Sequence, residues 1–247
     1  MSPTWITAFL DLADDDFKAG VVFWAEVTGY GVSAPRGEGG EFATLVPRRG
    51  AAFLRVQKLA VGPSRIHLDL HVGDPRAAAE EAVFLGARVV HLSKHGYVVM
   101  ASPAGFTFCF VSGPAATRPE AATWPGGCSI VDQVCLDIPP SAYADETAFW
   151  RDLTGWELAR SAVATQFSHL RRPPGQPFRL LLQRLDDERP MAAHLDLAAD
   201  DRAAETERHL ALGARLVRRE EHWTVLTDPA GSAYCLTDRD PRTGLLP

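Results

Sequence analysis

The chain lacks most of the features that mark secreted or membrane-spanning proteins. Only four of its 247 residues are cysteine, which is too few to predict a disulfide scaffold in a chain of this length. No apolar run approaches the ~20 residues that a helix needs to cross a bilayer. The first residues contain no basic segment followed by an apolar stretch, so no signal peptide is predicted. We therefore expect a cytoplasmic protein that does not bind a membrane.

Basic charge is also scarce. The 25 lysines and arginines are outnumbered by 31 aspartates and glutamates, and the formal net charge is -6. Proteins that bind nucleic acid need a basic surface to neutralise phosphates, so nucleic acid is not expected as a partner. Apolar residues make up 46% of the chain. That content and the length together allow two domains of ordinary size with buried cores.

An internal duplication is the strongest signal in the sequence. Leu10-Asp11 recurs as Leu136-Asp137, and Phe23-Trp24 recurs as Phe149-Trp150, both 126 positions later. Six further matches keep an offset of 126 or 127: Thr28-Gly29 with Thr154-Gly155, Gln57 with Gln183, His67-Leu-Asp-Leu with His194-Leu-Asp-Leu, Leu85-Gly-Ala with Leu212-Gly-Ala, Pro103-Ala-Gly with Pro229-Ala-Gly, and Cys109 with Cys235. We predict one copy over residues 1–113 and another over 128–242, with a linker at 114–127 and a tail at 243–247.

Each copy contains a weaker repeat, in which a strand precedes an acidic helix cap, a helix and further strands. In the first copy, an aspartate among residues 14–16 is expected to cap a helix that ends at Gly29. Phe17, Val21, Trp24 and Thr28 share one face of that helix. Asp74 and Asp201 are predicted caps of later helices, which end at Gly86 and Gly213. Strands are expected at 6–13, 42–46, 52–58, 66–72, 88–91, 97–101 and 107–112.

Several stretches carry a family likeness. They are Leu10-Asp-Leu-Ala-Asp, Phe23-Trp-Ala-Glu-Val-Thr-Gly-Tyr, Arg65-Ile-His-Leu-Asp-Leu and Ser102-Pro-Ala-Gly-Phe-Thr-Phe-Cys, with Asp228-Pro-Ala-Gly-Ser-Ala-Tyr-Cys in the second copy. In order and duplication they resemble the glyoxalase/bleomycin-resistance/dioxygenase (vicinal oxygen chelate) superfamily, and within it a glyoxalase-like subgroup. The resemblance implies an α+β fold of two tandem domains. Each domain would hold two βαβββ modules whose strands curl into a cup, with the helices outside.

The polar side chains expected in each cup follow from strand alternation. Leucines at positions 68 and 70 are needed under a helix, so the His and Asp of the same strand face the other way. With the first and last strands treated in the same manner, the predicted ligand-binding residues are Phe9, Asp11, Gln57, His67, Asp69 and Cys109 in copy one, and Cys135, Asp137, Gln183, His194, Asp196 and Cys235 in copy two.

The resemblance also implies where a metal would be held. Metal-bearing members take ligands from the first and last strands of each module, usually His, Gln and Glu. The equivalent positions here are Phe9, Gln57, His67 and Cys109, and Cys135, Gln183, His194 and Cys235. Cysteine replaces the last-strand glutamate in both copies, and a metal that prefers oxygen ligands is poorly served by these side chains. We expect no cofactor and assign no metal ligand. The alternative is a divalent ion such as zinc, if the thiols ionise.

Two hypotheses of function follow. In the first, the cups bind a small organic metabolite or natural product without a tightly bound catalytic metal. In the second, the chain is a lyase, isomerase or dioxygenase-type enzyme that uses a metal or acid/base catalysis, with His67 and His194 as the candidate catalytic residues. Both histidines could equally be structural, and one cup could bind while the other only supports the fold. We expect a small-molecule ligand and a monomer or homodimer.

Overall fold

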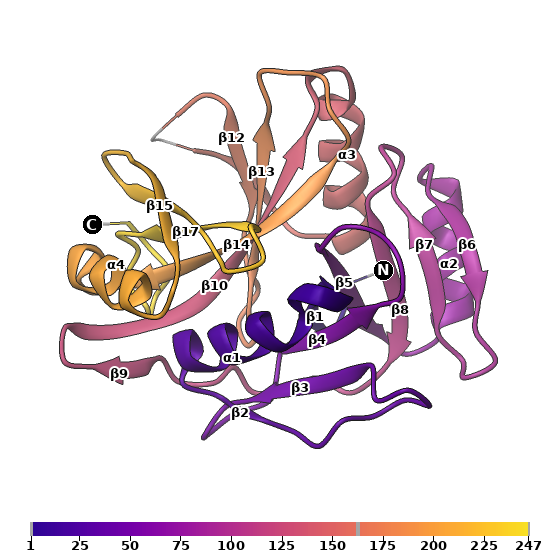
Figure 1. Ribbon diagram of the computed structural model, residues 1–247. Coiled ribbons are helices and arrows are strands. Elements are labelled where there is room, and N and C mark those ends of the chain that lie inside the picture. Colours follow the sequence, from indigo (N-terminus) through magenta and orange to yellow (C-terminus); the bar gives the residue numbers. More distant parts are fainter. Residues whose placement is uncertain (1, 162–163, 247) are drawn as a thin grey trace. The chain divides into compact units, whose positions relative to one another are not determined.

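A computed structural model describes residues 2–161 and 164–246 of the protein. The strands form two mixed sheets, one from each half of the sequence (Figure 1). The first has the order β2-β3-β4-β1-β5-β8-β7-β6, and the second has the order β11-β12-β13-β10-β14-β17-β16-β15, with β9 paired to β10. The two orders correspond strand for strand. The predicted α+β fold with two tandem βαβββ domains is therefore confirmed.

The elements lie close to the predicted ranges. The first copy contains β1 (Trp5–Ala13), the 3-10 turn η1 (Asp14–Asp16), α1 (Phe17–Thr28), β2 (Gly31–Val32), β3 (Phe42–Val46), β4 (Leu54–Leu59), β5 (Arg65–Val72), α2 (Pro75–Phe84), β6 (Arg88–Leu92), β7 (Val98–Ala101) and β8 (Thr107–Ser112). The rest of the chain contains β9 (Ala122–Trp124), β10 (Gly127–Ile138), η2 (Pro140–Ala142), α3 (Tyr143–Thr154), β11 (Leu158–Arg160), β12 (Phe167–Leu170), β13 (Arg179–Arg184), β14 (Ala192–Ala199), α4 (Arg202–Ala211), β15 (Arg215–Arg219), β16 (Trp223–Thr227) and β17 (Ala233–Thr237).

The chain divides into two compact units that do not follow the sequence copies. The first unit comprises residues 1–8, 66–117 and 134–193, and the second comprises 9–65, 118–133 and 194–247. Each unit therefore holds one βαβββ module from each copy, and strands β1 and β10 run from one unit into the other. The copy boundaries stay a prediction, and the outermost residues of the predicted ranges, 1 and 247, lie outside the described residues.

In the first unit, α2 packs on β7 and β8 (Figure 1). Asp74 is extended, and its Oδ1 accepts hydrogen bonds from the backbone amides of Arg76 at 2.9 Å and Ala77 at 3.2 Å. Gly86 follows the helix with φ at 103°, a left-handed conformation that glycine adopts without steric cost. Both predicted ends of this helix are confirmed.

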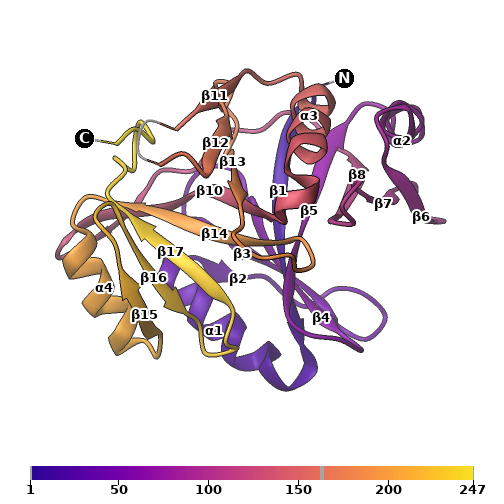
Figure 2. The same cartoon turned by 90° about the horizontal axis from the view of Figure 1, so that it is seen from above.

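In the second unit, α4 packs on β16 and β17 (Figure 2). Asp201 is again extended, and its Oδ1 accepts a hydrogen bond of 2.9 Å from the Ala204 amide. Gly213 has the same φ, 103°, as its counterpart after α2. The start and end of this helix are also as predicted, because cap and stop signals act over a few neighbouring residues.

The predicted cap of α1 is wrong. The residues from 14 to 16 wind into the turn η1, and no side chain among them caps the helix. Asp16 itself has near-helical angles, φ -91° and ψ -16°, whereas a capping aspartate is extended. Asp14 pairs instead with Lys58 at 2.9 Å, and Asp16 accepts a 3.4 Å hydrogen bond from Ser64. The helix also buries Gly20, Phe23 and Val27 beside the predicted Trp24 and Thr28, while Phe17 and Val21 are half-buried.

The helix tryptophans Trp24 and Trp150 are core residues. Trp24 is 2% exposed, and its indole N–H donates to Asp228 Oδ2 at 3.0 Å in the second unit. Trp150 is fully buried, and it donates to Glu146 Oε2 at 2.8 Å in the first unit. Burial raises the pKa of both carboxyl groups. Each unit thus gives its buried indole a carboxyl acceptor, but from a turn in one and from the helix itself in the other.

The predicted linker contains ordered structure. Strand β9 pairs with the beginning of β10, with Trp124 opposite Gly127. The Trp124 indole N–H donates to Ser129 Oγ at 2.8 Å. A composition of Pro, Ala, Thr and Gly therefore did not reveal that residues 118–127 form part of the second unit.

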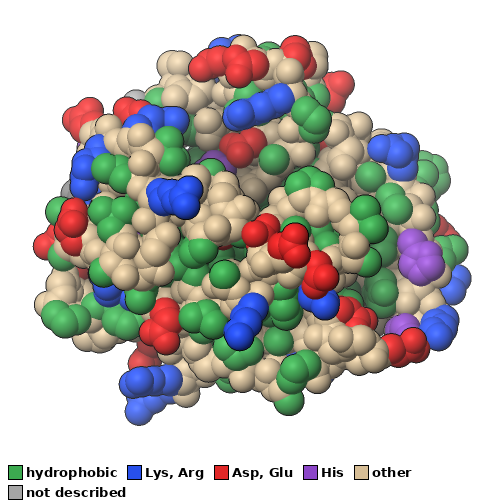
Figure 3. Space-filling view, viewed as in Figure 1, with side chains coloured by type: hydrophobic (Ala, Val, Ile, Leu, Met, Phe, Trp, Pro, Cys, Tyr) green, Lys and Arg blue, Asp and Glu red, His purple; other side chains and the backbone are tan. Residues whose placement is uncertain are grey.

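No helix among the described residues is long and apolar enough to cross a membrane. Basic and acidic side chains are interspersed on the face seen in Figure 3. That mixture accords with the modest net charge of -6.

Candidate functional site

A buried polar cluster lies between two parallel strands of the first unit. His67 and Asp69 point to the same side of β5, and Asp69 is directly opposite Cys109 of β8. The three residues are only 6 to 7% exposed. His67 Nε2 lies 3.7 Å from Asp69 Oδ1, and the three potential ligand atoms are all within 4.8 Å of one another. We call these residues the first-unit cluster.

The second unit contains an equivalent cluster of His194, Asp196 and Cys235. Asp196 of β14 is opposite Cys235 of the parallel strand β17. His194 Nε2 lies 3.3 Å from Asp196 Oδ1, and the three ligand atoms are again within 4.8 Å. Burial raises the pKa of the Cys235 thiol and the Asp196 carboxylate adds to the shift, so the sulfur is protonated at neutral pH. We call these residues the second-unit cluster.

One carboxylate oxygen of Asp196 lacks a hydrogen-bond donor of ordinary geometry among the described residues. Its Oδ2 accepts a short hydrogen bond from Gln133 Nε2. Its Oδ1 is buried and receives no hydrogen bond of ordinary geometry from any described residue, although the His194 imidazole lies nearby. A buried carboxylate oxygen without a donor is costly, so it is a natural acceptor for a bound hydroxyl or N–H group.

The remaining predicted residues come from two pairs of neighbouring strands, β10 with β13 and β1 with β4. In the first unit, the buried Cys135 lies 3.5 Å from Gln183 Oε1 and 3.8 Å from Asp137 Oδ1. In the second unit, Phe9 meets Phe42 edge to face with centroids 6.4 Å apart. In the same unit, Asp11 lies 3.4 Å from Arg65 Nε, and Gln57 is half-buried opposite Phe42 in the β3–β4 pairing.

Four polar residues on the strands of the predicted residues were missed by the sequence analysis. Gln133 bonds Asp196, and Thr7 Oγ1 lies 3.0 Å from His71 Nε2 in the first unit. Arg55 places its guanidinium 5.6 Å from the centre of the Phe9 ring, and Arg65 approaches Asp11. Each of the four lies two residues before a predicted residue on the same strand. Extending the two-residue alternation by one step would have found them all.

The donor atoms decide which metal these clusters fit. The non-haem iron(II) site of oxygenases combines two imidazoles with one carboxylate. Each cluster described above offers one imidazole, one carboxylate and one thiol, so neither fits that iron site. Zinc accepts nitrogen, oxygen and sulfur ligands, but the buried thiol would first have to lose its proton.

The imidazole–carboxylate pairs also allow chemistry without a metal. A carboxylate near an imidazole fixes which ring nitrogen carries the proton and stabilises the protonated ring. Such a pair can hold a ligand hydroxyl or move a proton to and from it. Both clusters contain this pair, with separations of 3.7 Å and 3.3 Å.

Comparison with solved structures shows a shared fold. Homoprotocatechuate 2,3-dioxygenase from Arthrobacter globiformis has a TM-score of 0.65 at 15% identity, over 96% of this chain and 81% of that one. A triple variant of 4-hydroxymandelate synthase from Streptomyces coelicolor has a TM-score of 0.64 at 15% identity, over 96% and 93%. For 2,2',3-trihydroxybiphenyl 1,2-dioxygenase from Sphingomonas wittichii the values are 0.62 and 17%, over 97% and 93%. At these identities the likeness establishes the fold alone.

Comparison of the sequence with known proteins gives a family. No curated protein matches the chain. The family model described as a glyoxalase-like domain matches twice, at residues 7–111 and 133–237. The two matches are offset by 126 residues, as the duplication predicts, and together they span most of the sequence. The chain therefore belongs to the glyoxalase-like domain family, with the domain present twice in tandem.

Proposed function

We propose that the protein binds a small oxygenated organic molecule at its two polar clusters and that it works without the iron of ring-cleaving dioxygenases. His67 and Asp69 would contact the ligand in the first unit, and His194 and Asp196 in the second. One observation carries the proposal. Both clusters bring together one imidazole, one carboxylate and one thiol, so neither provides the two imidazoles of an iron(II) site.

Burial of these groups supports a binding role. Removing a carboxylate and an imidazole from water costs free energy, which a purely structural site would normally recover through full hydrogen bonding. Asp196 Oδ1 does not recover it from described donors of ordinary geometry. A few polar groups that converge in an otherwise apolar surrounding are typical of small-molecule sites.

The names of the structural relatives suggest a class of ligand. Homoprotocatechuate 2,3-dioxygenase and 2,2',3-trihydroxybiphenyl 1,2-dioxygenase act, by those names, on hydroxylated aromatic compounds. We infer that a phenolic hydroxyl is a suitable partner here, because it can donate to the carboxylate and accept from the imidazole. A cytoplasmic location and a monomeric or homodimeric state remain predictions.

An enzyme of the same superfamily is the second candidate. It is favoured by the closeness of the donor atoms, which lie within 4.8 Å of one another in each cluster and would also suit a zinc ion. Without a metal, the imidazole of His67 or His194 could act as the acid or base of a lyase or isomerase.

Calorimetric titration with catechol, a simple hydroxylated aromatic, tests the binding proposal. Replacing His67 or His194 by alanine should weaken catechol binding by about three- to tenfold, the value of one hydrogen bond. The matched control is His95→Ala, since His95 is exposed. If both cluster variants bind catechol unchanged but melt at lower temperature, the histidines are structural and the proposal is wrong.

Elemental analysis of protein purified without added metal separates the two candidates. Substoichiometric metal is expected if the clusters bind an organic ligand directly. One equivalent of zinc, iron, nickel or manganese that disappears in the His67→Ala or His194→Ala variant would instead establish the metal-dependent alternative.

A further inference from the structure

A hollow in the second unit contains none of the residues of the two clusters. It has a volume of about 250 Å³ and lies among the end of α1, the loop after β3 and residues 120–124. Its walls are partly apolar, with Pro47, Ala122 and Trp124 among the lining residues, and partly charged. The space suits a compact organic molecule.

Two arginines of this hollow have no partner among the residues that the structure describes. Arg48 and Arg49 both line it and are exposed. Neither guanidinium makes a hydrogen bond or ion pair with any described residue. Glu120 is the single carboxylate among the lining residues, and it too is unpaired within the described part of the chain. The lining therefore carries a net charge of about +1, counted from these side chains.

The equivalent loop in the other copy also contains two arginines, and these two have partners. Strand β12 corresponds to β3 in sheet order, and the loop after it contains Arg171 and Arg172. Arg171 pairs with Glu157 at 3.5 Å, and Arg172 donates to the Pro177 carbonyl at 3.2 Å. Both cations are thus engaged within the first unit, whereas the pair beside the hollow is available to a ligand.

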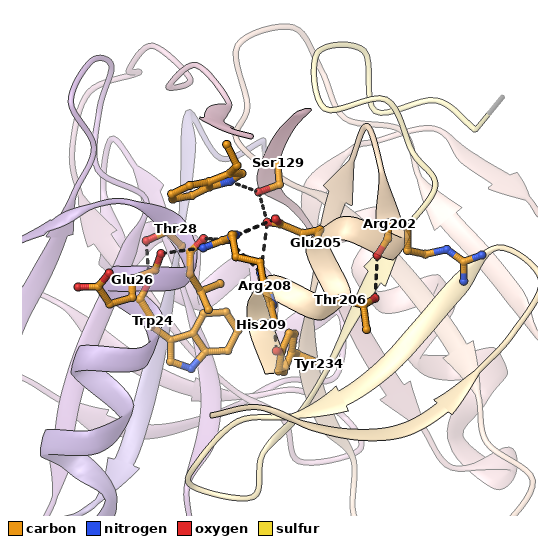
Figure 4. Close-up of polar contacts among 12 residues, drawn as sticks. Trp24, Glu26, Thr28, Ser129, Arg202, Glu205, Thr206, Arg208, His209 and Tyr234 are labelled. Carbon is orange, nitrogen blue, oxygen red and sulfur yellow. Dashed lines mark hydrogen bonds and ion pairs between the residues drawn. The ribbon is translucent and has the colours of Figure 1, made fainter. Parts of the chain in front are cut away.

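Trp124, another residue of the lining, is held firmly. Trp124 is anchored by its hydrogen bond to Ser129, and the Arg208 guanidinium lies 3.7 Å from the centre of its ring. Arg208 also donates to the carbonyls of Glu26 at 3.2 Å and Val27 at 2.7 Å, at the end of α1 (Figure 4). Because these carbonyls carry the negative end of the helix dipole, their bonds to a cation weaken the repulsion that an anion would meet here.

Tyr30 supplies a further polar group at the hollow. It lines the space, and its side chain is only 8% exposed. No described residue hydrogen-bonds its hydroxyl. Burial raises the pKa of Tyr30, so the hydroxyl stays protonated and can donate to an acceptor.

We propose that this hollow is a second binding site, which takes a small organic monocarboxylate with an apolar body. The carboxylate would lie between Arg48 and Arg49, whose planar guanidinium groups match its geometry. The apolar body would rest on the side formed by Ala122 and Trp124. A single negative charge is favoured because Glu120 limits the positive charge of the lining.

Calorimetric titration with benzoate, with benzamide as its neutral counterpart, tests the proposal. The wild-type protein should bind benzoate at least about tenfold more tightly than benzamide. The Arg48→Gln/Arg49→Gln variant should lose about tenfold or more in benzoate affinity. The Arg88→Gln/Arg215→Gln variant, which changes two exposed arginines outside the hollow, should bind as the wild type does.

Two further measurements locate the binding. His67→Ala and His194→Ala variants should retain benzoate affinity, which separates this site from the two clusters. All variants at exposed arginines should keep the wild-type melting temperature. The proposal is overturned if millimolar benzoate does not bind, if benzamide binds equally well, or if the Arg48→Gln/Arg49→Gln variant binds benzoate unchanged.

Discussion

Glu205 allows a sharp prediction about stability and pH. Its side chain is buried in the second unit and accepts hydrogen bonds from Arg208 at 2.7 and 2.8 Å and from Ser129 at 2.5 Å, and His209 Nε2 lies 3.2 Å away (Figure 4). Burial by itself would raise the pKa of Glu205, but these partners together lower it from 4.5 to about 2.

The size of the effect follows from this shift. A drop of about 2.5 pH units corresponds to about 3 kcal/mol of folding free energy, at about 1.4 kcal/mol per unit. Because the pKa is lower in the folded state, this stabilisation is complete above pH 4.5 and is lost as the pH falls towards 2. Glu205→Gln should therefore destabilise the protein by about 3 kcal/mol at neutral pH, and the difference from wild type should shrink in acid.

Urea unfolding of both proteins from about pH 7 to about pH 3 measures this difference. Burial raises the pKa values of Glu146 and Asp228. Both groups are present in the wild type and in the variant, so their contributions to the pH dependence cancel in the difference. Glu207→Gln is the matched control, since that side chain is on the same helix but 71% exposed, where an ion pair contributes little. A free-energy difference for Glu205→Gln that stays constant over the whole range would refute the reasoning.

Three other substitutions test local features by urea unfolding. Gly29→Ala should lower the free energy of unfolding by clearly more than the ~1 kcal/mol expected for Gly96→Ala. Both glycines have positive φ. An added Cβ at position 29 would lie 2.9 Å from an indole carbon of Trp124, whereas one at position 96 would have no neighbour within 4 Å. Equal costs would show that the indole simply moves aside. Asp74→Ala should cost about 0.5–2 kcal/mol, because two amides lose their acceptor, and an unchanged midpoint would rule out a capping role. Trp24→Phe should cost about 1–3 kcal/mol by leaving Asp228 without its indole donor. If that cost is unchanged in an Asp228→Ala background, the hydrogen bond contributes nothing.

Local signals were reliable for most of the fold. Strand β3 and strand β8 have the predicted bounds, and helices end at Gly29, Gly86 and Gly213 because glycine takes the left-handed conformation there. The cap of α1 failed for a non-local reason. Lys58 and Ser64, about 40 to 50 residues away, take two of the carboxylates that the sequence offered to the helix.

Only part of the candidate site could be predicted from local sequence patterns. Alternation placed His67 and Asp69 on one face of a strand, because side chains of a strand alternate whatever its neighbours are. It could not show that Cys109 lies opposite Asp69, since that depends on the parallel register of β5 and β8. The hollow beside Arg48 and Arg49 was also hidden, because residues 120–124 form part of its lining and the composition indicated them to be a linker.

The sequence by itself determined the duplication, the order of the modules and the polar face of each central strand. The duplication is read directly from matches 126 or 127 positions apart, and capping and alternation act over a few neighbouring residues. The tertiary structure decided which modules share a compact unit: each unit combines modules from different copies. It also decided which side chains meet within a unit, as Arg208 meets the end of α1. Packing brings together residues about 180 positions apart, and no local pattern encodes such a meeting because it depends on the whole buried surface.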